Sequence, residues 1–372
     1  MKTVVFFVSG HGFGHASREV EVMNALGKRL GADLRLIIRS AVGPGLLERT
    51  LTVPYELRSG PCDTGVVQHN SVTHDDDATI RAAVEFYAMF DARVAAEALA
   101  LADANVQLVV SDIAPLGLAV AYQLGVPSVF VGNFTWDWIY DGMVDFASRA
   151  PGVNDTIRRA QALASVTLRL PLSPSFDGTG LPHVADLPLI TRRATHTRSA
   201  TRAHFNLPAD RKLALLSFGG YGLNALDLAG VDCIDEWSFV ATDRSVNDPR
   251  VAALPFVHAL PESALTSRDI RYEDLVAAVD AVITKPGFGI IGECATFGTP
   301  MVYTSRGDFR EYDVLVEIMP RVLRCAFIDQ ASLFAGRWRD ALTSATTQPA
   351  PPERLDPNGA DVAAGIIATL AG

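Results

Sequence analysis

Residues 4–15 read VVFFVSGHGFGH, an apolar run that breaks into glycines and histidines. Such a run followed by a glycine turn is typical of a buried parallel strand that enters a helix. Glycines let the backbone approach a ligand closely, and the free N–H groups at the start of the next helix favour an anion. The segment therefore predicts a strand over 4–8 and a helix over 16–29 in a nucleotide-binding α/β domain.

A second turn of this kind lies far along the chain, in Lys285-Pro286-Gly287-Phe288-Gly289. It follows the apolar run 281–283 and precedes Glu293. Another glycine turn, Gly219-Gly220, follows the apolar run 213–218. Glycine turns at opposite ends of the chain indicate two nucleotide-fold halves that face each other across a cleft.

Apolar strands and amphipathic helices alternate between these turns. Apolar strands separated by helices indicate parallel sheets covered on both faces. We predict an α/β fold of two Rossmann-like doubly wound domains, residues 1–185 and 186–355, with a C-terminal helix within 356–372 that packs back on the first domain. The other predicted strands are 34–38, 107–110, 128–131, 239–242 and 301–304, and the other helices are 78–104, 116–124, 272–279, 290–297, 311–319 and 359–370.

The composition narrows the class of protein. The 372 residues are 49% hydrophobic and carry 32 basic and 42 acidic side chains, a net charge of −10. This charge disfavours nonspecific binding to nucleic acid. No apolar run approaches the roughly 20 residues of a membrane span. The four cysteines form no Cys-x-x-Cys pair, and no signal peptide is evident, so we expect reduced thiols and a cytoplasmic protein.

Two side chains of the first half predict acid–base chemistry. His15 follows the first strand, and Asp112 follows the buried run 107–110, so both are expected at the carboxyl edge of one parallel sheet. A carboxylate there orients an imidazole and leaves its other nitrogen to take a proton. The alternatives are that His15 only packs and that Asp112 caps the helix starting near Pro115. His11 and His15 lack a third ligand near them in sequence, so no metal site is expected.

The second half predicts an anion site. Gly219 and Gly220, together with the helix start at 287–289, form backbone cradles for phosphate, with Lys285 beside them. The carboxylate of Glu293 is suited to accept hydrogen bonds from two vicinal ribose hydroxyls. The loop 305–311 is charged, and its alternative interpretation is a solvated surface loop.

These motifs resemble the inverting, metal-independent nucleotide-sugar glycosyltransferases of the GT-B fold over most of the chain. The N-acetylglucosaminyltransferase of peptidoglycan synthesis and the plant UDP-glycosyltransferases belong to this group, and the first turn is most similar to the N-terminal region of plant L-arabinokinases. The resembling segments are Phe13-Gly14-His15, Val110-Ser111-Asp112, Lys285–Gly289 with Glu293, and Gly298-Thr299-Pro300.

The resemblance implies roles for the two domains and for named residues. Residues 1–185 would bind the acceptor and 186–355 the nucleotide diphosphate sugar, which is expected to be UDP-linked, with no cofactor and no metal. His15 would be the base that Asp112 orients. His11, Phe13 and Trp136 would contact the acceptor, although Trp136 could instead be core, as tryptophans usually are. The expected donor-binding residues are Gly14, Ser217, Gly219, Gly220, Arg271, Lys285, Gly287, Phe288, Gly289, Glu293, Asp308, Arg310 and Glu311.

One segment departs from the family pattern. Family members often present Asp-Gln or Gln-Gln to the donor sugar, whereas this chain has Phe309-Arg310-Glu311. The sequence therefore predicts an enzyme that transfers a sugar to an acceptor hydroxyl of unknown identity. The alternatives are a nucleotide-sugar 2-epimerase or hydrolase, or a non-catalytic nucleotide-sugar-binding domain. An oxidoreductase is disfavoured because His15 replaces the third glycine of the dinucleotide fingerprint.

Overall fold

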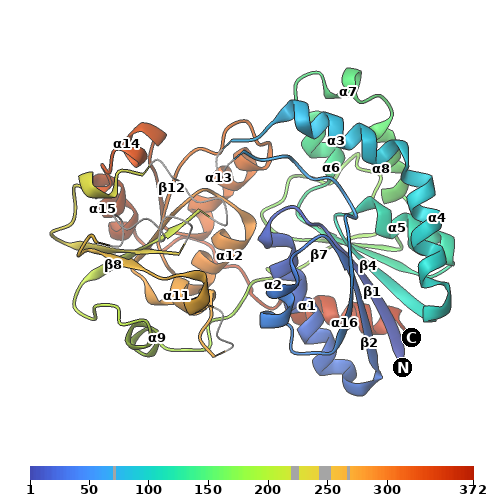
Figure 1. Ribbon diagram of the computed structural model, residues 1–372, viewed down its shortest axis with the longest axis horizontal. Coiled ribbons are helices and arrows are strands. Elements are labelled where there is room, and N and C mark those ends of the chain that lie inside the picture. Colours follow the sequence, from blue (N-terminus) through green and yellow to red (C-terminus); the bar gives the residue numbers. More distant parts are fainter. Residues whose placement is uncertain (70–72, 219–225, 243–252, 266–268) are drawn as a thin grey trace.

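The computed structural model describes residues 1–69, 73–218, 226–242, 253–265 and 269–372. Each half of the chain forms a parallel β-sheet with helices on both faces (Figure 1). The first sheet ends with Asp186 and the second begins with Lys212. The predicted fold class is therefore confirmed, whereas the exact domain limits at 185 and 355 stay predictions.

The first sheet has the strand order β3-β2-β1-β4-β5-β6-β7, with every neighbouring pair parallel. Alternate residues of β1 enter different cores: Val4 and Phe6 pack on one face, and Val5 and Phe7 on the other. Because both faces are buried, this strand reads as a continuous apolar run. The strands are β1 (Lys2–Val8), β2 (Leu34–Ser40), β3 (Tyr55–Ser59), β4 (Val106–Asp112), β5 (Ser128–Gly132), β6 (Val166–Arg169) and β7 (Val184–Asp186).

The second sheet has the strand order β10-β9-β8-β11-β12-β13, again parallel. Strand order reverses between β1 and β4 in the first sheet and between β8 and β11 in the second. Ligands of doubly wound folds bind at the carboxyl ends of strands at such reversals. The strands are β8 (Lys212–Ser217), β9 (Trp237–Ala241), β10 (Val257–Ala259), β11 (Ala281–Thr284), β12 (Met301–Tyr303) and β13 (Cys325–Phe327).

Helices of the two halves share one continuous core. Side chains of α1, α2 and α16 pack with those of α11, α12 and α13 in a single cluster that joins one face of each sheet. The other face of the first sheet is covered by α3–α8, and that of the second by α14 and α15. The bounds are α1 Phe13–Leu30, α2 Pro44–Thr50, α3 Asp76–Ala88, α4 Phe90–Leu101, α5 Pro115–Leu124, α6 Trp136–Asp141, α7 Phe146–Arg149, α8 Val153–Gln161, α9 Arg198–His204, α11 Tyr272–Ala278, α12 Phe288–Phe297, α13 Glu311–Val322, α14 Gln330–Phe334, α15 Arg339–Thr347 and α16 Gly359–Leu370.

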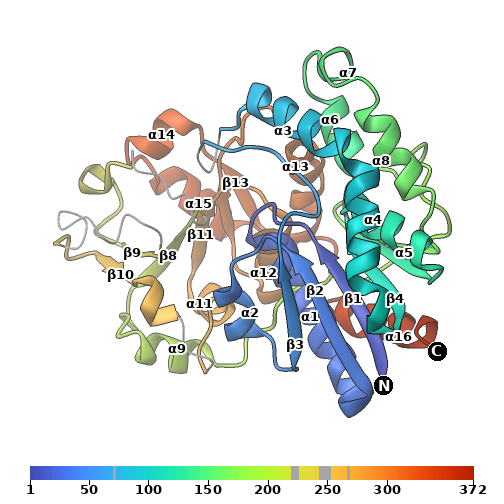
Figure 2. The ribbon, with the colours of Figure 1, turned by 45° about the vertical axis from the view of Figure 1, so that its right-hand side comes forward.

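The C-terminal helix α16 returns to the first domain and packs along α1, as predicted (Figures 1 and 2). Its start is held by backbone bonds to the segment that leaves the first sheet: Gly359 N–H donates to the Leu189 carbonyl (3.0 Å), and Leu189 N–H donates to Asp356 (2.8 Å). A Cβ at Gly359 would lie 2.2 Å from the Pro188 carbonyl oxygen. Glycine is therefore needed where the two crossing segments meet.

One predicted helix is wrong in extent. The segment 78–104 is two helices, α3 and α4, which separate at Met89. There the Met89 N–H donates to Phe86, three residues back, so the α-helical bonding tightens for one turn. This turn lets the rings of Tyr87 and Phe90 stack at 5.6 Å in the core.

Candidate active site

The first glycine turn leads into a helix as the sequence predicts, but α1 begins at Phe13, three residues before the predicted start, so His15 lies in its first turn. Gly12 precedes the helix with φ = 75°, a conformation that favours glycine, and no side chain caps the helix. A Cβ built at Gly12 or Gly14 would meet nothing within 4 Å. Phe13 is 56% exposed. The first N–H groups of α1 therefore lie beside open space at the carboxyl edge of the first sheet.

His15 and Asp112 meet at this edge. The His15 Nδ1 lies 3.0 Å from Oδ2 and 3.2 Å from Oδ1 of Asp112, and both side chains are buried. Asp112 is the last residue of β4, and α5 begins after Ala114 with no side-chain cap. The capping alternative for Asp112 is thus excluded by the geometry, and the pairing that the sequence predicts is present.

Arg18 joins this pair and was not anticipated from the sequence. Its Nη2 donates to Asp112 Oδ1 and lies 3.1 Å from His15 Nδ1. Although burial opposes ionisation of Asp112, the charges of Arg18 and His15 hold its pKa below the ordinary value. The sequence signal that could have identified Arg18 was its position, because it lies one helical turn after His15.

A chain of polar contacts continues from Arg18 into the second domain. Arg18 Nη1 donates to Asn133 Oδ1 (2.8 Å), and Asn133 Nδ2 donates to Glu311 Oε1 (2.8 Å). Arg306 donates to the other oxygen of Glu311 (3.2 Å). Asn133 follows β5 and Glu311 begins α13, so this contact joins the two domains. Glu311, which departs from the family pattern, is thus linked through Asn133 and Arg18 to the predicted pair of His15 and Asp112.

Arg310 also binds across the domains. Its Nη1 donates to the Trp138 carbonyl (2.5 Å), and its guanidinium lies 4.6 Å from the centre of the Trp138 ring. Asp308, two residues earlier, is exposed. Arg310 and Glu311, at the start of α13, therefore contact the first domain, whereas the Asp308 side chain is exposed.

An aromatic cluster surrounds His11. Trp136 is fully buried with its ring edge against His11 at 5.2 Å, and Phe309 of the second domain stacks on His11 at 6.2 Å. Trp136 Nε1 donates to buried Asp63 (2.8 Å). Burial, then the charges of His15, Arg306 and Lys285, lower the pKa of His11. Trp136 is thus part of the core and also reaches the predicted acceptor residue His11.

The second glycine turn begins α12 beside α1. Gly287 precedes the helix without a side-chain cap, and a Cβ at Gly287 or Gly289 would meet nothing within 4 Å. Phe288 is buried against Arg18, whose guanidinium lies 5.4 Å from the ring centre. The open starts of α1 and α12 therefore belong to neighbouring helices (Figure 2). Both helix starts favour an anion.

Lys285 lies just before this helix start. Burial, followed by the charge of Arg306, lowers the pKa of Lys285 to about 7, and Glu311 acts in the opposite direction. Within the part of the chain that the structure describes, no carboxylate pairs with the Lys285 ammonium. When an anion binds next to a buried lysine whose pKa is lowered, it stabilises the charged form of that lysine.

Glu293 lies on α12 and is bound by an arginine. Arg192 Nε donates to Glu293 Oε1 (2.6 Å), and its Nη1 lies 3.4 Å from Glu273. The second oxygen of Glu293 is buried and has no hydrogen-bond partner among the described residues. Burial raises the pKa of Glu293 to about 7 against the opposing charge of Arg192. Glu293 therefore keeps one oxygen without a hydrogen-bond partner among the described residues.

The remaining predicted donor residues have these positions. Ser217 ends β8, and its hydroxyl accepts from Tyr272 (2.5 Å). The N–H of Arg271 donates to Asp274 (2.9 Å), and its Nε lies 2.8 Å from Glu273. Gly219 and Gly220 lie outside the described residues. In the free protein, Arg271 is therefore engaged by its own helix.

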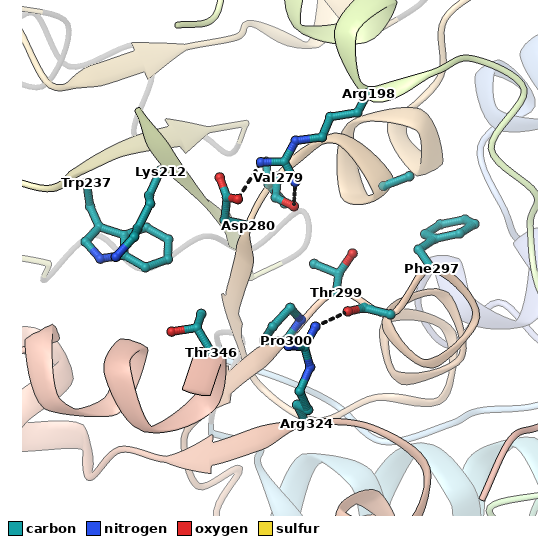
Figure 3. A pocket seen from close by; sticks show the side chains of 12 residues that line it. Arg198, Lys212, Trp237, Val279, Asp280, Phe297, Thr299, Pro300, Arg324 and Thr346 are labelled. Carbon is teal, nitrogen blue, oxygen red and sulfur yellow. Dashed lines mark hydrogen bonds and ion pairs between the residues drawn. The ribbon is translucent and has the colours of Figure 1, made fainter. Parts of the chain in front are cut away.

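A separate cavity of about 260 Å³ lies at the opposite, amino edge of the second sheet (Figure 3). Its basic side chains already have partners: Arg198 binds Asp280, and Arg324 donates to the Gly298 carbonyl (2.8 Å). Lys212 lies against the Trp237 ring and pairs with Glu236. None of the predicted site residues lines this cavity.

Comparison with known proteins defines the fold. The crystal structure of the glycotransferase of kitacinnamycin matches the whole of both chains with a TM-score of 0.65 at 19% identity. The chain has the GT-B fold. No protein-family model matches it.

Two curated relatives are similar in sequence to this GT-B chain. The L-arabinokinase of Arabidopsis thaliana is 27% identical over 367 residues, which are 97% of this chain and 34% of that protein. The chain therefore spans about a third of the length of that relative. A UDP-N-acetylglucosamine–N-acetylmuramyl-(pentapeptide) pyrophosphoryl-undecaprenol N-acetylglucosamine transferase of Clavibacter michiganensis subsp. michiganensis is 27% identical over 165 residues, 43% of this chain and 44% of that protein. The resemblance predicted from the sequence is confirmed.

The described residues contain no group of three or more His, Cys, Asp or Glu side chains that could hold a metal ion. In the same residues, no helix combines the length and apolarity that a membrane crossing needs.

Proposed function

We propose that this GT-B chain is an inverting glycosyltransferase that moves a sugar from a uridine diphosphate sugar to an acceptor hydroxyl without a metal. The observation that carries the proposal is the buried His15–Asp112 pair on α1 and β4, next to the open start of α12. The relatives and structural neighbours named as transferases support it. The kinase activity named for the plant relative is not assigned to this chain.

In the proposed donor site, the diphosphate binds at the start of α12. The N–H groups at Gly287–Gly289 and the ammonium of Lys285 would neutralise its charge. The free oxygen of Glu293 would accept from a ribose hydroxyl while Arg192 holds the other oxygen. Glycine at 287 and 289 leaves room for the phosphates to approach the backbone.

The proposed reaction is a single displacement. The acceptor oxygen forms a bond to the anomeric carbon while its proton passes to Nε2 of His15. The bond from that carbon to the phosphate oxygen breaks on the opposite face, and its electron pair leaves with the diphosphate. Asp112 accepts from Nδ1 and stabilises the imidazolium that forms. Displacement on the opposite face inverts the anomeric configuration.

Calorimetric titration with UDP, dTDP, GDP and NAD, with a chelator present, tests the donor site. Selective binding of UDP supports the proposal, whereas binding of NAD, or of none of the four, overturns it. Donor turnover is then followed by mass spectrometry with and without a panel of acceptors. A sugar transferred by the wild type and not by His15→Ala supports a glycosyltransferase. Donor consumed without any acceptor indicates an epimerase or hydrolase, and binding without turnover indicates a binding domain.

A further inference from the structure

The hydrogen-bond chain from Glu311 to His15 has a defined direction. A carboxylate only accepts, so the amide Nδ2 of Asn133 must donate to Glu311, and its Oδ1 is left facing Arg18. A guanidinium only donates, and Arg18 Nη1 donates to that oxygen at 2.8 Å. All three side chains are buried. The second domain therefore determines which way the Asn133 amide points and, through it, where Arg18 is anchored.

Asp112 and the second terminal nitrogen of Arg18, Nη2, compete for Nδ1 of His15. His15 Nδ1 lies 3.0 Å from Asp112 Oδ2 and 3.1 Å from Arg18 Nη2. If Nδ1 carries the proton, it donates to Asp112, and Nε2 has the lone pair that a base needs. If Nδ1 is bare, it accepts from Arg18, and the proton lies on Nε2. The position of the Arg18 guanidinium thus selects between a competent and an incompetent tautomer.

We propose that Arg18, Asn133 and Glu311 form a positioning relay through which the second domain sets the tautomer of His15. While Glu311 holds Asn133, the guanidinium stays anchored on Asn133 and Asp112, and His15 Nδ1 donates to Asp112. When Glu311 moves away, Asn133 no longer fixes Nη1, and Arg18 donates its remaining Nη2 proton to His15. The inference rests on the proposed role of His15 as the base, and it ties that role to contact between the domains.

Nitrogen-15 NMR of histidine-labelled free protein tests the relay. For a neutral imidazole, the nitrogen shifts distinguish a proton on Nδ1 from one on Nε2. The His15→Gln variant assigns the His15 signals among the eight histidines. We expect the Nδ1–H tautomer to dominate in the wild type. In Glu311→Met and Asn133→Leu, we expect the tautomer ratio to shift at least severalfold toward Nε2–H.

Two matched variants separate the relay from a loss of domain contact in general. Arg310→Gln removes another contact between the same domains, the bond to the Trp138 carbonyl, and is expected to keep the wild-type tautomer. Glu311→Gln retains an oxygen that can accept from Asn133 and is expected to restore the Nδ1–H form. The signals of the other histidines report whether each variant is folded, and Glu311→Met carries the test alone if Asn133→Leu does not fold.

A wild-type tautomer ratio in Glu311→Met overturns the relay, as does an equal shift in Arg310→Gln. This experiment needs no substrate, so its failure leaves the proposed transfer reaction untouched. Conversely, a normal tautomer response in a protein that transfers no sugar contradicts the function and not the relay.

Discussion

Arg192 binds the carboxylate of Glu293, although the two residues are 101 positions apart in the chain. The pair connects the segment that follows the first sheet with α12 of the second domain. Glu293 is only 2% exposed, and Glu273 lies on the other side of the same guanidinium. The arginine thus compensates two buried carboxylates at the proposed ribose site.

Arg192→Met is expected to destabilise the protein. Removing one partner of a buried ion pair leaves an uncompensated charge, which costs about 3–5 kcal/mol. The double variant Arg192→Met/Glu293→Met is expected to recover part of that loss, because one buried carboxylate is also removed. Urea unfolding measures both free energies. A single variant as stable as the wild type would show that the pair contributes little.

Asp112→Asn is expected to lower the turnover number of the proposed transfer by a factor of about 10²–10⁴, the range for general-base catalysis. Asparagine keeps the shape of the side chain but cannot stabilise an imidazolium with charge. Donor affinity, measured by calorimetry, should stay close to that of the wild type, since Asp112 is buried beneath His15. Turnover equal to the wild type would remove Asp112 from the mechanism.

Lys285 is expected to take up a proton when a diphosphate binds. Its pKa of about 7 leaves it mostly neutral one pH unit higher, and a nearby anion favours the charged form. Calorimetry near that higher pH in buffers of different ionisation enthalpy measures the uptake as the slope of the observed enthalpy. Diphosphate affinity should fall as pH rises above about 7.

Lys285→Arg is the matched control for this prediction, because arginine stays charged throughout the same range. When the Lys285→Arg variant binds the diphosphate, any protons released or taken up should be those of the nucleotide itself. If wild type and Lys285→Arg show the same slope, Lys285 does not bind the diphosphate.

Glu19 is expected to make stability fall as pH rises. It is fully buried on α1, and neither of its oxygens has a hydrogen-bond partner among the described residues. Burial, then the charge of Asp112, raises its pKa well above the ordinary value, against the opposing charge of Arg18. Between the unfolded and folded pKa values the native state binds the extra proton, so the free energy of unfolding decreases with rising pH.

Glu19→Gln removes this dependence. Near the ordinary glutamate pKa of about 4.3, the variant and the wild type should have similar melting temperatures. At higher pH the melting temperature of the variant should exceed that of the wild type by a growing margin. Thermal unfolding across that range measures the difference. A constant difference at all pH values would mean that Glu19 does not titrate with folding.

Local patterns in the sequence predicted much of the fold and of the site. The apolar run 4–8 predicts a buried strand, because a strand covered on both faces needs apolar residues throughout. The glycine turns at 12–14 and 287–289 predict open helix starts, because glycine has no side chain to fill the space, and Gly12 also has a positive φ. The edge of a parallel sheet then brings His15 and Asp112 together. Short strands such as β3, β7 and β13 were missed, since three to five residues carry little periodic signal.

Contacts distant in sequence were decided only by the tertiary structure. No local pattern pairs Arg192 with Glu293, Asn133 with Glu311, or Arg18 with Asp112, because each pair depends on how helices and sheets pack. The sequence by itself determined which strand ends carry chemistry, through residue type and the topology of parallel sheets. The packing of helices and sheets decided which charges are buried together, and burial is what moves the pKa values of Lys285 and Glu293.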